Sequence, residues 1–96
     1  MDLTTKAPRS PYEKIGHIVF VARTLDKVRA ELAGTLGSYH WRVGTSATVL
    51  EWLGIDADEL LAAMPELADD AAAWNWIEAR MTRRTDVEIA SFNAAM

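Results

Sequence analysis

Apolar residues recur at helical spacing in this 96-residue chain, most clearly between about residues 22 and 33. At ~100° of rotation per residue, four apolar side chains share one side of such a helix, and four other residues lie opposite. The apolar side consists of Val21, Leu25, Val28 and Leu32, and the opposite side consists of Arg23, Asp26, Lys27 and Ala30. Gly34 and Gly37 follow and predict the end of this helix.

A second, shorter helix is predicted from the residues on either side of it. Thr45 or Ser46 is a suitable N-cap, and the helix then runs to Leu53. Gly54 followed by Ile55 has the form of a glycine C-cap with an apolar residue after it.

Capping patterns also mark the second half of the chain. The pattern Asp56-x-x-Glu59 predicts a helix that stops before Pro65, and Thr85-x-x-Glu88 opens a last helix that runs to near the C-terminus. Another helix is expected over about residues 70–81. Four to five helices joined by short loops predict a compact all-α single domain over residues 10–96, preceded by an N-terminal arm at residues 1–9.

The segment before the first clear helix is less regular. Residues 10–13 (Ser-Pro-Tyr-Glu) have helix-start chemistry, with serine at the N-cap and proline at the first helical position. Gly16 follows quickly, so this helix is short or is broken there. The β-branched residues at 17–21 suit either a buried extended segment or the lead-in to the next helix.

Two patterns near the C-terminus bear on association. Trp74 and Trp76 project ~200° apart on a helix, so Trp74 can join a core stripe while Trp76 points elsewhere. The last helix is apolar on two sides, which is typical of a sandwiched helix or of a subunit contact. The core stripe comprises Trp74, Ile77 and Met81, and the two sides of the last helix comprise Ile89, Phe92 and Met96, and Val87, Ala90 and Ala94.

Composition narrows the class of protein and of partner. Hydrophobic residues make up 50% and charged residues 25% of the chain, as in ordinary globular proteins. The net charge of −4 argues against a nucleic-acid partner. The chain has no cysteine, which excludes thiolate chemistry and fits a reducing cytoplasm. No apolar run approaches the ~20 residues that cross a bilayer, and the N-terminal residues lack a secretion signal, so we expect a cytoplasmic protein without membrane contact.

The charged side of the helix at 22–33 is the first candidate site. Arg23 and Lys27 are i,i+4 neighbours, and such a cation pair can hold a carboxylate or a phosphate. The alternative is a solvated face on which Lys27 pairs with Glu31, and Asp26 pairs with Arg29.

The second candidate is the aromatic segment Tyr39-His40-Trp41. A histidine here can act as a general base near neutral pH, and the tyrosine can supply a hydroxyl donor. The alternative is that the two aromatic residues cover the core while His40 faces water, because alternate residues of an extended segment face opposite ways.

His17 is a weaker candidate, because it precedes an apolar run where a structural role is more common. The two histidines lack the spaced carboxylates of a metal site. The chain also has no glycine-rich phosphate loop and no nucleophile motif, so we expect neither a metal nor another cofactor.

Several of these segments together resemble a bacterial family catalogued as domain of unknown function 5069. They are Pro8-Arg9-Ser10-Pro11, Arg23-x-x-Asp26-Lys27-x-Arg29-Ala30, Gly34-x-x-Gly37-x-Tyr39-His40, Leu53-Gly54-Ile55 and Arg84-Thr85…Glu88-Ile89…Asn93. The resemblance covers nearly the whole chain and implies that the polar residues Arg9, Arg23, Asp26, Lys27 and Tyr39 belong to the family pattern. His17 stands where a second glycine is expected, Phe92 stands where tryptophan is expected, and residues 42–48 do not match.

The leading hypothesis is a site for an anionic or polar small molecule between the helix at 22–33 and the loop at 38–42. In its catalytic form it performs cofactor-free proton transfer, addition or elimination. It assigns acid–base or orienting roles to His40, Tyr39 and Asp26, and ligand contacts to Arg23, Lys27, Arg9, Trp41, Trp52 and His17. The competing hypothesis is a non-catalytic interaction module that self-associates or docks onto a partner through Trp76 and residues 86–96.

Overall fold

The computed structural model describes residues 2–96, and over these residues the protein is all-α. Its helices are α1 (Val21–Leu32), α2 (Gly44–Leu53), α3 (Ala57–Ala63), the short 3-10 helix η1 (Met64–Glu66), α4 (Asp70–Arg80) and α5 (Asp86–Ala95). Strand-like pairing within this range is limited to one isolated bridge between Ile15 and Ile18.

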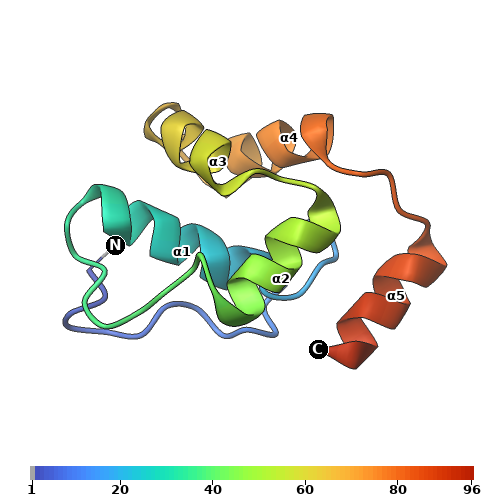
Figure 1. The fold of residues 1–96 in the computed structure, drawn as a ribbon, viewed down its shortest axis with the longest axis horizontal. Helices are drawn as coiled ribbons and strands as arrows, with labels where there is room; N and C mark the ends of the chain where they lie inside the picture. The colour runs from blue at the N-terminus through green and yellow to red at the C-terminus, as the bar shows by residue number, and fades with distance from the viewer. Residues whose placement is uncertain (1) are drawn as a thin grey trace.

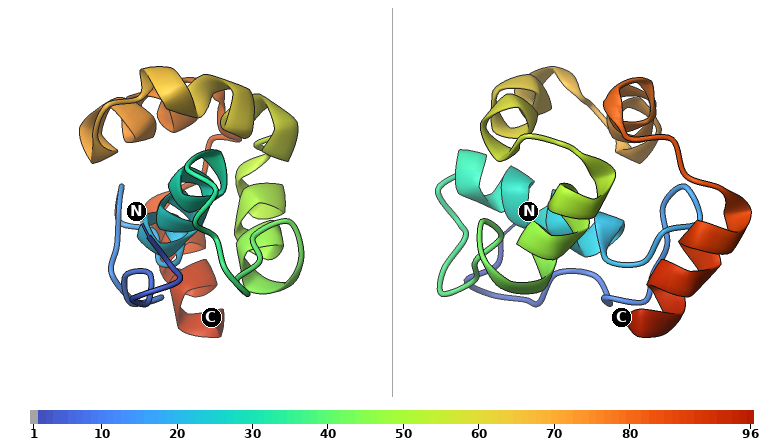
Figure 2. Two further views of the ribbon diagram at one scale, coloured as in Figure 1. Left: turned by 90° about the vertical axis from the view of Figure 1, so that its left-hand side faces the viewer. Right: turned by 45° about the vertical axis from the view of Figure 1, so that its right-hand side comes forward.

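The helices form two layers with α5 at one end of the molecule. Helices α3 and α4 lie together above α1 and α2, and α5 is set apart beside them (Figures 1 and 2). The core lies between the two layers and includes Leu25 and Val28 of α1, Leu53 of α2 and Ile77 of α4, each at most 1% exposed. The apolar side predicted for α1 therefore faces the core, except that Leu32 is 45% exposed.

The N-terminal arm lies against the helical body. Leu3 is 4% exposed, and its backbone N–H donates to the carbonyl of Thr35, 2.9 Å away. The arm then runs below α1 (Figure 1) and brings Arg9 next to that helix.

Local capping explains where four of the helices begin or end. The side chains of Asp56, Asp69 and Thr85 each accept a hydrogen bond from a backbone N–H in the first turn of α3, α4 and α5, respectively. Thr85 and Glu88 form a complete capping box. Gly54 ends α2 in the left-handed conformation, with a φ of 75°, as its place in the sequence predicts.

Two predicted helix starts are wrong. Residues 10–13 form a single turn, in which Ser10 accepts hydrogen bonds from the N–H groups of Tyr12 and Glu13, and no helix follows. Helix α2 begins after Val43, which has no side-chain acceptor, rather than after Thr45 or Ser46. In each case a local signal was outweighed by long-range packing.

The segment at 17–21 is a tight turn that leads into α1, and not an extended segment. Gly16, His17 and Phe20 all have positive φ, at 59°, 66° and 69°. A Cβ atom at Gly16 would lie 2.1 Å from Cζ2 of Trp74, so only glycine fits there. The left-handed backbone at His17 explains why a glycine is expected at this position.

Helix α5 packs through one of its two apolar sides. Ile89, Phe92 and Met96 contact the core, whereas Val87 on the other side is 79% exposed. The ring of Phe92 stacks on that of Trp52, with 4.2 Å between ring centroids. None of the helices between residues 2 and 96 is both long enough and apolar enough to cross a membrane.

Candidate functional site

A hollow of about 520 Å³ lies between α1, the loop that follows it and the start of α2. Its cationic and aromatic sides come from elements that are separated in sequence but adjacent in the fold. The lining residues are Pro11, Phe20, Arg23, Lys27, Ser38, Tyr39, His40, Val43, Gly44, Thr45 and Ser46. Four of the predicted site residues therefore meet in one place: Arg23, Lys27, Tyr39 and His40.

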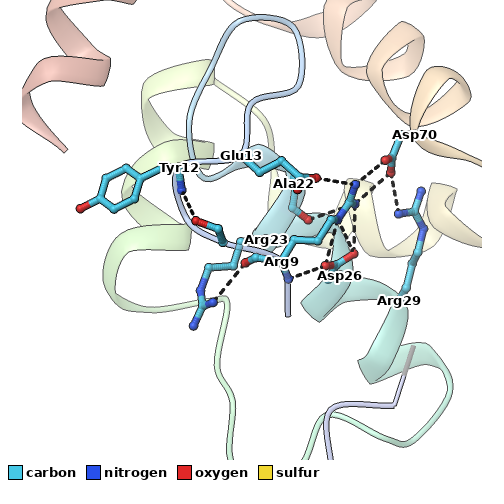
Figure 3. A network of polar contacts seen from close by, with 9 residues as sticks. Arg9, Tyr12, Glu13, Ala22, Arg23, Asp26, Arg29 and Asp70 are labelled. Carbon is cyan, nitrogen blue, oxygen red and sulfur yellow. Dashed lines mark hydrogen bonds and ion pairs between the residues drawn. The ribbon is translucent and has the colours of Figure 1, made fainter. Parts of the chain in front are cut away.

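Both cations of α1 lie near the ring of Tyr39. The guanidinium carbon of Arg23 is 5.8 Å from the ring centroid, and Nζ of Lys27 is 5.7 Å from it. Contacts of this length are within the range of cation–π attraction. Arg23 also donates from Nη1 to the carbonyl oxygen of Arg9, 3.2 Å away (Figure 3).

Neither cation is neutralised by a carboxylate within residues 2–96. The ion pairs of the alternative interpretation are not formed, since Glu31 accepts from Nε1 of Trp41, and Arg29 pairs with Asp70. Burial of the ammonium, and secondly the charge of Arg23, lower the pKa of Lys27 below its usual value. The hollow thus holds two cations that repel each other.

The first turn of α2 supplies further donors to the hollow. Val43, the N-cap residue, has extended backbone but offers no side-chain acceptor to the first N–H groups of the helix. Gly44, Thr45 and Ser46 line the hollow. Ser46 is 3% exposed, and its hydroxyl accepts a hydrogen bond from Thr24 of α1, which joins the two helices.

Asp26 does not line the hollow but stands behind it. It is 2% exposed and binds Arg9, both through the backbone N–H at 2.8 Å and through the guanidinium at 3.0 to 3.2 Å. Because the carbonyl of Arg9 accepts from Arg23, Asp26 contacts the cation pair only indirectly. Figure 3 shows Arg23 turned away from the carboxylates that surround Arg9.

Arg9 is the centre of a network that crosses the molecule. Its guanidinium also contacts Asp70 at the start of α4, and Asp70 accepts from Arg29 of α1 at 2.9 Å (Figure 3). The hydrogen bonds from Arg9, and then from Arg29, lower the pKa of Asp70 despite its partial burial. The hydrogen bonds of Arg9 to Asp70, and then to Asp26, raise the pKa of Arg9 despite its partial burial. These four side chains hold the arm, α1 and α4 together.

The remaining predicted residues lie elsewhere. Trp41 is 1% exposed and lies in the core, and His40 is exposed. The alternative that Trp41 covers the core while His40 faces water is therefore correct for these two side chains. Trp52 stacks on Phe92 of α5. His17 lies by α5, where its carbonyl accepts from Asn93. Among residues 2–96 no cluster of three or more histidine or acidic side chains is arranged to hold a metal ion.

Sequence reasoning missed several residues of the hollow and of its support. Phe20 and Val43 line the hollow, and the partner of Arg9 and Arg29 is Asp70. The one sequence signal near Val43 was that residues 42–48 do not match the family pattern. Nothing local connects Asp70 with a residue 61 positions earlier.

Comparison with known proteins identifies the family of the chain. The profile of the family described as "Domain of unknown function (DUF5069)" matches residues 5–96, so the chain belongs to this family. The match confirms the resemblance seen in the sequence. A search of curated proteins finds no match.

Proposed function

We propose that this member of the family binds a small anion in the hollow between α1 and α2. The observation that carries the proposal is that Arg23 and Lys27 share this hollow without a carboxylate partner. Structural cations in a partly buried place are usually paired, and here the available carboxylates are engaged elsewhere. An anion would offset both the burial of the ammonium and its repulsion by Arg23, which together lower the pKa of Lys27.

The geometry suits such a ligand. An arginine offers a planar fork of donors and a lysine offers a compact charge, and both match carboxylate and phosphate oxygens. The start of α2 adds the positive end of a helix dipole, equivalent to about half a charge. At an effective dielectric constant of 20, one charge pair 4 Å apart attracts by about 4 kcal/mol, before the cost of desolvation.

The catalytic form of the proposal assigns proton transfer to His40 and Tyr39. Both line the hollow, and His40 is exposed, so it can exchange protons with water. Asp26 would act as a positioning residue, through Arg9 and its carbonyl bond to Arg23. Replacing His40 by glutamine should leave anion affinity largely intact while abolishing any turnover, whereas loss of affinity would make His40 a binding group instead.

The test is calorimetric titration of inorganic phosphate into the Arg23→Met/Lys27→Met double variant. We expect binding to be lost. The melting temperature should stay within a few degrees, because neither side chain belongs to the hydrophobic core. The matched control is Lys6→Met/Lys14→Met, which removes two exposed cations outside the hollow. Equal binding by the two double variants would show that the hollow is not the anion site.

Self-association through α5 is a second candidate. Trp76, which the sequence also assigned to this contact, is instead packed partly buried against the core. Val87 is 79% exposed, and no residue of α5 is buried in a single chain. Part of the apolar surface of α5 is therefore left available for contact with a second copy of the chain. Light scattering should then give a mass above that of one chain, and Val87→Lys should reduce it. A monomeric mass for the unaltered protein rejects this candidate.

A further inference from the structure

The hollow has an apolar side next to its cations, and this side indicates what the anion is attached to. Pro11, Phe20 and Val43 line it together with Arg23 and Lys27. A hollow of about 520 Å³ is of the size that holds an organic ligand, since ligand pockets usually measure about 300–1,000 Å³. An inorganic anion would fill only part of this space.

The backbone of Phe20 is held in an unfavourable conformation at this place. Its φ is 69°, in the left-handed region that bulky residues rarely occupy. Three hydrogen bonds maintain it: the N–H of Phe20 donates to the carbonyl of Pro11 at 2.7 Å, and the carbonyl of Phe20 accepts from the N–H and the hydroxyl of Thr24. Strain that is maintained in this way is common at functional sites.

Tyr12 extends the apolar side towards solvent. Its ring packs edge-on against Phe20, with 6.3 Å between centroids and an interplanar angle of 67°. Tyr12 is 65% exposed, and Val43 on the lining is 64% exposed. These are two of the four large hydrophobic residues that are exposed within residues 2–96, and both adjoin the hollow.

This inference rests on the proposed anion site. We propose that the ligand is a phosphomonoester of a flat, largely apolar group. The phosphate would lie between Arg23 and Lys27, and the ring would lie against Phe20 and Val43, with Tyr12 at the rim. A phosphomonoester carries close to two negative charges at neutral pH, which matches the two cations better than a single carboxylate does. Its three terminal oxygens also give a guanidinium and an ammonium separate acceptors.

The experiment compares four probes by calorimetry on the full chain: phenyl phosphate, inorganic phosphate, benzoate and phenol. We expect phenyl phosphate to bind about tenfold more tightly than inorganic phosphate, because its ring is removed from water against aromatic side chains. Benzoate and phenol should bind more weakly than phenyl phosphate.

Two variants then test the apolar side. Tyr12→Ala and Phe20→Leu should each reduce the affinity for phenyl phosphate by a larger factor than the affinity for inorganic phosphate, because each removes part of the apolar contact with the ring. Val87→Ala shortens an exposed apolar side chain that does not line the hollow and should change neither affinity. A circular-dichroism melt identifies any variant that is unfolded, and Tyr12→Ala alters only an exposed ring.

The failures are distinguishable. Equal affinity of the unaltered protein for phenyl phosphate and inorganic phosphate overturns this inference and leaves the anion site standing. Absence of binding by all four probes overturns both proposals. Benzoate or phenol binding at least as tightly as phenyl phosphate rejects the phosphomonoester class.

Discussion

Lys27 has a partly buried ammonium, a neighbouring cation and a binding role in the proposed anion site. Its ammonium is half-buried beside Arg23, and both effects disfavour the charged form. A bound anion would favour the charged form instead. The proton of Lys27 is therefore linked to anion binding, and its titration reports on the hollow.

We predict that affinity for inorganic phosphate falls as the pH rises through the lowered pKa of Lys27, and thus below the 10.5 of an ordinary lysine. The sign follows because the neutral amine, which dominates above that pKa, attracts the anion less. Calorimetric titrations between about pH 8.5 and 10.5 measure this, because inorganic phosphate is mostly dianionic over this range, which lies well above its second ionisation. Lys27→Arg should keep the binding and remove the pH dependence. The same fall in the arginine variant would assign it to another group.

The helices that line the hollow differ from the other helices in how they begin. Helices α3, α4 and α5 each begin with a side chain that accepts from the first turn. The N-cap residues of α1 and α2 are Phe20 and Val43, and neither side chain accepts a hydrogen bond from its helix. The two uncapped starts both contribute to the lining of the hollow. Both starts therefore leave their first backbone N–H groups without a side-chain acceptor.

We predict that Val43→Asp stabilises the protein and weakens phosphate binding. The extended backbone of Val43 suits an N-cap, and a new capping carboxylate should raise the free energy of unfolding by about 1 kcal/mol. The same carboxylate would occupy the donors of α2 and repel the anion. Urea denaturation and calorimetry measure the two effects.

Val43→Ala is the matched control, because it removes the apolar side chain without adding an acceptor or a charge. It should leave phosphate affinity unchanged. Greater stability in Val43→Asp without any loss of phosphate affinity would exclude the start of α2 from the site.

At the scale of the whole molecule, the network of Arg9 joins parts that helix packing alone leaves separate. It ties the N-terminal arm to α1 through Asp26, and both to α4 through Asp70. Because the carbonyl of Arg9 also accepts from Arg23, the network positions the cation side of the hollow. Stability and site geometry therefore depend on the same side chain.

We predict that Arg9→Met lowers the free energy of unfolding by about 3 kcal/mol, because it leaves the buried carboxylate of Asp26 without its partner. Adding Asp26→Leu should recover much of this loss, since the unpaired charge is then removed. Urea denaturation of the two single variants and the double variant measures the coupling. Additive losses in the double variant would show that the two side chains are not energetically paired.

The success of prediction varied with the range of the interaction. Asp56 and Thr85 act within one helical turn, and their helices begin where the sequence indicates. Ser10 has the same local chemistry but starts only a turn, because the chain is then held by the bond from Phe20 to Pro11 and by the close approach of Gly16 to Trp74. A local signal cannot reveal such distant competitors.

The candidate site was predictable in part for the same reason. Arg23 and Lys27 share a helical face by their spacing, and Tyr39 follows after a short turn, so these groups could be placed together from the sequence. Asp26 was assigned to the wrong neighbours, since its partner Arg9 lies 17 residues earlier and binds it from the arm. Trp52 was predicted to line the site because it is a large aromatic residue, but its ring stacks on Phe92 of α5 instead.

The amino-acid sequence by itself determined the helical class, most helix ends and the cationic face of α1, because these follow from side-chain period and from bonds within a few residues. Only the tertiary structure decided which carboxylates reach Arg9, and that Phe20 and Val43 would flank the cations. Those contacts depend on how separate elements pack against the core, which the local sequence around each residue does not specify.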